Sequence, residues 1–165
     1  MMPVMKRVLT AVCVGCCLLL GGIAVADGGP SADTISSQHM IAQAMLTAYF
    51  IDAARKAGMA TEEINAALAK VAEQSIISEF WISDENGQIA FSNVQGADFA
   101  FPTDPEAATQ AAPFAVLLGG MERAVVQEAL PRELDAAIFK YVGVAGIDQP
   151  RIVQVGISAT ELSAP

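Results

Sequence analysis

The chain has 165 residues and is acidic, with 18 Asp and Glu side chains against 9 Lys and Arg and a formal net charge of −9. This charge excludes nucleic acid and anionic lipid surfaces as partners, because both would repel the protein. All three cysteines, Cys13, Cys16 and Cys17, lie near the amino terminus, so the rest of the chain forms no disulfide, no cysteine metal site and no thiolate nucleophile.

The first 26 residues are predicted to be a signal peptide. Lys6 and Arg7 supply the positive start, Val8 to Leu20 is an almost uninterrupted apolar run, and Ala24-Val25-Ala26 has the small-x-small pattern of a signal peptidase site. We therefore expect cleavage after Ala26 and a periplasmic or secreted protein of about 139 residues. Residues 27–31 form a short leader before the folded domain.

Two alternatives for this segment stay open. Val8 to Ala26 spans about 19 residues, which is just enough to cross a bilayer, so the segment would act as an amino-terminal membrane anchor if it were retained. Val14-Gly15-Cys16 faintly resembles a lipidation motif, although its cysteine lies inside the apolar run rather than after it.

Two helices are expected next. Ala32 to Ala57 contains no Gly or Pro and repeats apolar residues at helical spacing, and Gly58 is a typical residue to end a helix. Its predicted inner face consists of Ile35, Ala42, Leu46, Tyr49, Phe50, Ala53 and Ala57, with His39 on the same stripe and Ile41 and Met45 widening it. So broad a stripe indicates more than one neighbour, either the domain's own sheet and a second helix or a partner chain. The second helix is predicted to be capped by Thr61 and to turn Ile64, Leu68, Val71 and Ser75 inward.

Five strands are expected after the helices. Residues 77–83 and 89–92 are rich in β-branched and aromatic side chains, and Asp84-Glu85-Asn86-Gly87 between them predicts a hairpin turn. Residues 93–112 are irregular, with short helices expected at 105–110 and 114–118. Three more strands are expected at 123–129, 136–144 and 151–158, with turns at 131–135 and 146–150. The expected fold is therefore α+β: a five-stranded antiparallel sheet with a long amino-terminal helix and helices over the sheet.

The hairpin and the last two strands carry a family resemblance. Phe80-Trp81-Ile82-Ser83-Asp84-Glu85-Asn86-Gly87 resembles the first hairpin of Cache domains, the extracytoplasmic PAS-like sensors of bacterial chemoreceptors and histidine kinases. Phe139-Lys140-Tyr141-Val142-Gly143-Val144 and Asp148-Gln149-Pro150-Arg151-Ile152-Val153-Gln154-Val155-Gly156 look like their final strands. The resemblance implies one single-Cache, PAS-like domain over residues 32–160, a chemotaxis-related sensing role, and a homodimer formed through the N-terminal helix.

Two features separate the chain from many Cache sensors. The chain ends at Pro165, soon after the last expected strand, so we expect a freestanding binding component or one that acts with a separate membrane signalling protein. Some similar sensors carry covalent haem through Cys-x-x-Cys-His, which the cysteine-free processed chain excludes. The Tyr, Arg, Trp and Asp arrangement of the amino-acid-binding members does not occur either.

No catalytic constellation is expected. His39 is the only histidine, and on the inner side of a helix it is interpreted as a packing residue rather than a base or a ligand. Asp84 and Glu85 are interpreted as turn residues and not as a Ca²⁺ site. No Gly-x-Ser-x-Gly motif and no phosphate-binding glycine loop occurs. We therefore expect no enzyme activity, no cofactor and no metal.

The candidate ligand site is aromatic. Trp81 in the first strand shares a parity with Phe139 and Tyr141 in the fourth, so all three are expected on one face of the sheet. Phe99 and Phe101 of the irregular segment are expected to hang over that face. The predicted ligand-binding residues are Trp81, Phe101, Lys140 and Tyr141.

Charge suggests the ligand class. Lys140, Arg132 and Arg123 are cations near the aromatic residues, and a cation beside an aromatic hollow suits a small organic molecule with a carboxylate. Lys140 and Tyr141 alternate along one strand, however, and both face one pocket only if that strand is irregular. The alternative is that the aromatic residues fill the core and that the domain has a structural or protein-interaction role with no small-molecule ligand.

Overall fold

The fold comes from a computed structural model that describes residues 29–96, 98–133 and 135–162; the predicted signal peptide, residues 1–26, lies outside them. The helices are α1 (Ala32–Lys56), α2 (Thr61–Glu73) and α3 (Ala159–Leu162), and a 3₁₀ helix, η1, spans Ala112–Leu117. The strands are β1 (Glu79–Ser83), β2 (Ile89–Ser92), β3 (Ala124–Val126), β4 (Leu130–Pro131), β5 (Ile138–Ala145) and β6 (Ile152–Ser158).

The protein is α+β, as the sequence predicts, and its strands form one antiparallel sheet in the order β2-β1-β6-β5-β3. The last strand, β6, lies between β1 and β5, an arrangement consistent with PAS-like folds. The sheet has one strand more than predicted, because β4 pairs with the start of β5, with Leu130 opposite Phe139 and Pro131 opposite Ile138. Two residues are too few to show the alternating pattern that identifies a strand in a sequence.

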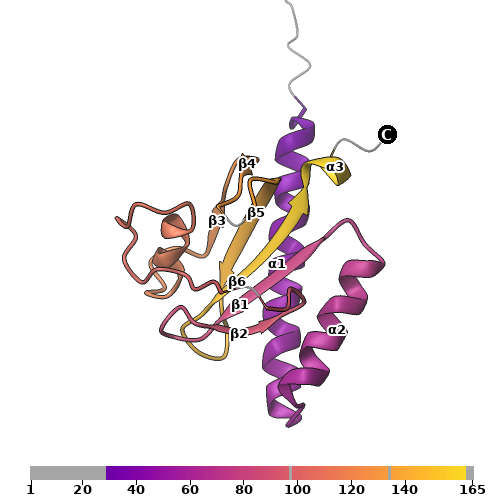
Figure 1. The fold of residues 1–165 in the computed structure, drawn as a ribbon, viewed down its shortest axis with the longest axis vertical. Helices are drawn as coiled ribbons and strands as arrows, with labels where there is room; N and C mark the ends of the chain where they lie inside the picture. Colours follow the sequence, from indigo (N-terminus) through magenta and orange to yellow (C-terminus); the bar gives the residue numbers. More distant parts are fainter. Residues whose placement is uncertain (1–28, 97, 134, 163–165) are drawn as a thin grey trace, which may run out of the picture.

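The sheet separates two hydrophobic cores (Figure 1). On one face α1 packs along β5 and β6, while α2 packs on β2 and β1. The other face is covered by the long segment between β2 and β3, which includes η1. Alternation along β5 shows the division, because Val142 and Val144 contribute to the core under the helices and Phe139 and Tyr141 to the core under η1.

α1 buries a different face from the one predicted. Its buried side chains are mostly small: Ser37, Met40, Ala44, Thr47, Ala48, Ile51 and Ala54. Leu46 and Tyr49 of the predicted face are 63% and 58% exposed, His39 is exposed as well, and Phe50 at the edge of that face is half-buried. Small side chains let the helix approach the sheet closely, and periodicity alone does not reveal which of two apolar faces makes that contact.

The start of α2 also differs from the prediction. The N-cap is Ala60 rather than Thr61, and its backbone N–H donates to the carboxylate of Glu63 (2.9 Å), which supports the first turn of the helix. The predicted inner face is correct for Ile64 and Leu68, which are buried, and wrong for Val71 and Ser75, which are exposed.

The turn between β1 and β2 holds the next segment over the sheet. The Asp84 carboxylate accepts from the backbone N–H groups of Asn86 (2.8 Å) and Gln88 (2.9 Å), which confirms its interpretation as a turn residue. Gly87 has a φ of 79°, and its carbonyl accepts from the backbone N–H of Phe101 (2.9 Å). A Cβ at Gly87 would clash with the Phe101 carbonyl, so this approach requires glycine.

The irregular segment contains less helix than predicted. Residues 105–110 form turns instead of a helix, and the Asp104 carboxylate accepts from the backbone N–H of Glu106 (2.9 Å) at their start. The helix predicted at 114–118 is present as η1, two residues earlier and in 3₁₀ form.

Gly143 of β5 permits η1 to pack directly on the sheet. A Cβ at this position would lie 2.7 Å from Cδ1 of Phe114 and 3.1 Å from Cδ1 of Leu117, and both of these side chains are fully buried. We predict that Gly143→Ala lowers the free energy of unfolding by about 1–3 kcal/mol, as is typical of an overpacked core. Urea denaturation measures the loss. Gly119→Ala is the matched control, because its Cβ would meet nothing closer than 3.8 Å, and equal losses in the two variants would contradict the close packing at Gly143.

Candidate functional site

A cavity of about 310 Å³ lies on the face of the sheet opposite α1. Its lining comes from β1, β5 and β6 below, from the segment between β2 and β3 above, and from the turn that follows β4. The strand register places the sheet residues, since Trp81 lies opposite Gln154 and the neighbouring row contains Glu79, Gly156 and Tyr141. The volume falls at the lower end of the range for small-molecule sites.

Four aromatic side chains line the cavity: Trp81, Phe99, Phe114 and Tyr141. Trp81 and Phe99 meet edge to face with ring centroids 5.2 Å apart, which is a favoured geometry for aromatic pairs. Trp81 and Tyr141 are 4% and 7% exposed, and Phe114 is completely buried. The cavity walls are therefore built from rings whose positions are fixed by packing.

Three glutamines line the cavity with unused hydrogen-bonding capacity. Gln154 is 4% exposed, and its amide has no hydrogen-bond partner among the described residues. Gln127 Nε2 donates to the backbone carbonyl of Gln110 (2.9 Å), but Gln127 Oε1 and Gln110 Nε2 are buried and lack a partner in the described parts of the chain. A buried polar atom without a partner costs about 1–3 kcal/mol, so the unpaired atoms of Gln110 and Gln127 are suited to bind a polar guest, and the free amide of Gln154 offers a further hydrogen-bonding group beside them.

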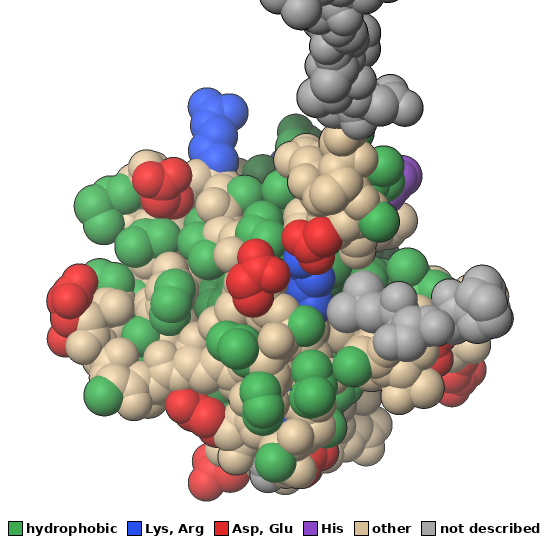
Figure 2. Space-filling view, turned by 90° about the horizontal axis from the view of Figure 1, so that it is seen from above, with side chains coloured by type: hydrophobic (Ala, Val, Ile, Leu, Met, Phe, Trp, Pro, Cys, Tyr) green, Lys and Arg blue, Asp and Glu red, His purple; other side chains and the backbone are tan. Residues whose placement is uncertain are grey.

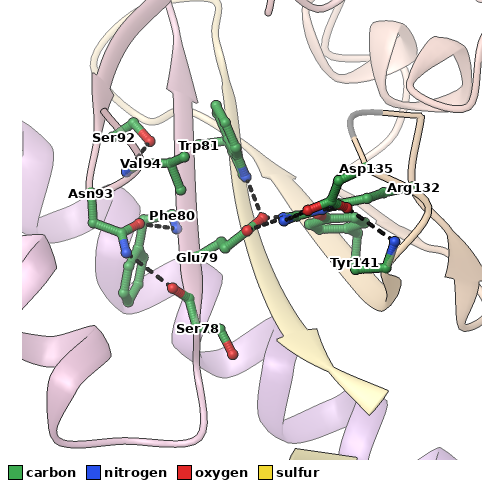
Figure 3. Close-up of polar contacts among 11 residues, drawn as sticks. Ser78, Glu79, Phe80, Trp81, Ser92, Asn93, Val94, Arg132, Asp135 and Tyr141 are labelled. Atoms are coloured by element: carbon green, nitrogen blue, oxygen red, sulfur yellow. Dashed lines mark hydrogen bonds and ion pairs between the residues drawn. The ribbon is translucent and has the colours of Figure 1, made fainter. Parts of the chain in front are cut away.

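A buried carboxylate, Glu79, lies behind two of the aromatic walls (Figure 3). Its Oε2 accepts from the indole Nε1 of Trp81 (2.9 Å) and from the hydroxyl of Tyr141 (2.8 Å), and its Oε1 accepts from the guanidinium of Arg132. Gly156 lies between Glu79 and Tyr141 in the sheet, and a Cβ there would lie 2.5 Å from Cε1 of the tyrosine ring. Because glycine has no Cβ, the ring of Tyr141 can cross β6 at this point and reach the carboxylate of Glu79.

Burial, and then the neighbouring Glu79 charge, raise the pKa of the Tyr141 hydroxyl above its ordinary value. The phenol is therefore held in its protonated form, in which it can donate to Glu79.

Arg132 is placed by the turn between β4 and β5. Its backbone N–H donates to the carbonyl of Ala137 (2.9 Å), and its guanidinium carbon lies 4.3 Å from the ring centroid of Phe139. Besides its bond to Glu79, the guanidinium binds Asp135 through Nε (2.7 Å) and Nη2 (2.6 Å). The Asp135 bonds raise the pKa of Arg132, which burial opposes, and the same bonds lower the pKa of Asp135 to about 2. The guanidinium is thus held between two carboxylates.

The four residues predicted to bind the ligand occupy three different places. Trp81 and Tyr141 line the cavity. Phe101 is buried one layer behind it, with its ring centroid 5.0 Å from that of Phe99. Lys140 lies on the opposite face of the sheet, as regular alternation requires, where it is 1% exposed and pairs with Asp33 of α1. The sheet therefore separates Lys140 from the cavity.

The polar lining was not identified from the sequence. Gln154 carries a recognisable signal, because it interrupts the otherwise apolar stretch Ile152–Ile157, and Glu79 stands in the same way beside Phe80 and Trp81. Gln110 and Gln127 lie in irregular segments, where no periodicity indicates which way a side chain points.

Metal ions and membranes are two further candidate partners of residues 29–96, 98–133 and 135–162. No group of three His, Cys, Asp or Glu side chains in these ranges is arranged to hold a metal ion. No helix within them is both long and apolar enough to cross a membrane.

No protein-family model matches this chain, and no curated protein is significantly similar to it. The function of the cavity must therefore be inferred from the residues that form it.

The two carboxylates on Arg132 differ in exposure, and we predict that they differ in their effect on stability. Glu79→Gln replaces one of the two accepting oxygens by an NH2 group and removes the charge that pairs with Arg132, and it should lower the free energy of unfolding by about 3 kcal/mol. Asp135→Asn breaks an exposed pair, which is screened by solvent, and should have a clearly smaller effect. Urea denaturation at pH 7 compares the two variants. Equal losses would contradict the central role of Glu79.

The pKa of Asp135 also predicts a pH dependence. Its value of about 2 in the folded protein lies below the ordinary 3.8, so the folded state favours the charged form. The resulting stability is fully present above the ordinary pKa and is lost as the pH falls through the folded pKa. Urea denaturation between pH 7 and pH 2 should therefore show the difference between the wild type and Asp135→Asn shrinking at the acid end. A difference that is independent of pH would contradict the bond to Arg132.

Proposed function

We propose that this protein is an extracytoplasmic domain that binds a small organic molecule noncovalently in the cavity opposite α1. The observation that carries the proposal is a set of unpaired glutamine amides in an aromatic cavity of about 310 Å³. Gln110 Nε2 and Gln127 Oε1 are buried without a partner among the described residues, and the side chain of Gln154, which is 4% exposed, forms no hydrogen bond with them. A structural domain with a filled core, which is the alternative, has no use for such a group. The predicted signal peptide supports the location, and the Cache resemblance supports a sensing role.

We also propose that the domain acts with a separate membrane signalling protein. Support comes from β5, where Tyr141 faces the cavity and the adjacent Lys140 pairs with Asp33 in the first turn of α1. Tyr141, which a bound ligand would contact, is thus the direct neighbour in sequence of Lys140, which contacts α1 on the opposite face of the sheet. Seen from the end at which α1 begins, carboxylates are scattered over the surface and basic side chains are few, which supports a partner other than nucleic acid (Figure 2).

A homodimer through α1 is the third part of the proposal. The exposed face of α1 carries large apolar side chains, among them Met45, Leu46 and Tyr49 at 48%, 63% and 58% exposure. Beside them lies a second hollow of about 350 Å³ between α1 and the sheet, which also exposes Ile147. An apolar stripe of this kind on a helix favours packing against another copy of the same helix.

Ligand binding can be tested with a signal that the chain already contains. Trp81 is its one tryptophan and lines the cavity, so a bound molecule should change the fluorescence. We expect at least one compound from a panel of organic acids, amino acids and amines at millimolar concentration to do so and to raise the melting temperature. Gln154→Leu should weaken binding of that compound at least tenfold by removing the unpartnered amide.

The matched control is Gln74→Leu, which makes the same change at an exposed position after α2. It should bind as the wild type does. The proposal fails if no compound in the panel changes either the fluorescence or the melting temperature.

The dimer is tested separately. Leu46→Glu places a charge in the centre of the exposed stripe, and we expect it to convert a dimer into a monomer in analytical ultracentrifugation because like charges would face each other. Val71→Glu, at an exposed apolar position of α2, should leave the dimer intact. A wild-type protein that is monomeric at high concentration contradicts this part of the proposal.

A further inference from the structure

We infer that the cavity selects an organic cation, a small molecule with an ammonium group on an apolar body, rather than the carboxylate that the sequence predicts. This inference rests on the proposed function, since it names the chemical class of the ligand for the same cavity. Three observations carry it: the state of Arg132, the remaining charges of the lining, and the chemistry of the walls.

Arg132 is the basic residue of the lining, but its charge is already neutralised. Nη1 binds Glu79, and Nε and Nη2 bind Asp135, so every nitrogen of the guanidinium has a carboxylate partner. The Phe139 ring packs against the guanidinium as well. A ligand carboxylate would have to compete with two carboxylates that are already in place, one of them buried.

The other charges of the lining are negative. Asp98 and Glu133 line the cavity, and neither forms an ion pair with a basic residue in the described parts of the chain. Glu133 is held in position because its carboxylate accepts from the backbone N–H of Gln110 (2.8 Å). With Glu79 and Asp135, which bind Arg132, the cavity and its walls contain four carboxylates and one guanidinium, and this excess attracts a cation and repels an anion.

The walls are suited to an ammonium group. The rings of Trp81, Phe99 and Tyr141 offer π-faces or edges to the cavity, and an aromatic face attracts a cation within about 6 Å of its centroid. The unpartnered Oε1 of Gln127 and the amide oxygen of Gln154 accept hydrogen bonds from an N–H or O–H of the guest. These neutral acceptors point to a ligand with hydrogen-bond donors, independently of the acidic residues. The unpaired donor Gln110 Nε2 suits a hydroxyl oxygen on the same ligand.

The inference is tested with three molecules of one shape and different charge: choline, its neutral isostere 3,3-dimethyl-1-butanol, and the anion 3,3-dimethylbutanoate. Trp81 fluorescence and isothermal titration calorimetry measure each affinity on the wild-type protein. We expect choline to bind at least tenfold more tightly than the alcohol and the anion to bind most weakly. A higher NaCl concentration should weaken the binding of choline and leave the affinity for the alcohol unchanged.

Variants identify the source of the preference. Asp98→Asn and Glu133→Gln keep the shapes of the side chains and should each reduce the choline-to-alcohol ratio several-fold, while Glu73→Gln, an exposed acid on α2, should leave it unchanged. Equal or tighter binding of the alcohol or the anion, or binding of an organic acid from the panel while choline fails, overturns the inference and leaves the proposed function standing. Failure of the whole panel, charged and neutral, overturns the proposed function itself.

Discussion

The buried carboxylate of Glu79 is the constraint on which the cavity depends. Taking a carboxylate out of water costs several kcal/mol unless its oxygens are satisfied. Here the donors are the indole of Trp81, the hydroxyl of Tyr141 and the guanidinium of Arg132, which come from β1, β5 and the turn before β5. All three groups line the cavity, and two of them are aromatic rings, so the interaction that satisfies the charge also fixes the orientation of these rings.

Because side chains alternate along β5, neighbouring residues lie on opposite faces of the sheet and make different contacts. Tyr141 contacts Glu79 on the cavity face, while Lys140 crosses under α1 to Asp33. The sheet therefore lies between the cavity and α1 as a single layer, and one peptide unit connects their polar contacts. A ligand is able to act on α1 through this layer only if the Lys140–Asp33 pair has two arrangements that the ligand binds differently.

The order of elements could be predicted from the sequence because helical and strand periods differ and the turns are marked by Gly, Pro, Asn and Asp. The packing face of α1 could not, since both faces are apolar and the outcome depends on small residues such as Ala44 and Ala48 at a contact that only the folded sheet defines. Within the candidate site, alternation correctly predicted that Trp81 and Tyr141 lie on one face of the sheet. Gln110 lies in an irregular segment, where no periodicity predicts the direction of a side chain.

The proposed ligand class depends on assigning the charges of an acidic protein to their partners within the protein before assigning them to ligands. Counting residues suggested a free cation beside the aromatic rings, and a carboxylate to meet it. In the described residues, however, Arg132 and Lys140 are each bound to an acidic side chain, and Arg123 lines the hollow beside α1 rather than the aromatic cavity. Where acids outnumber bases two to one, buried bases find partners within the protein first. The charge that remains for a ligand is then the unpaired surplus, which is negative.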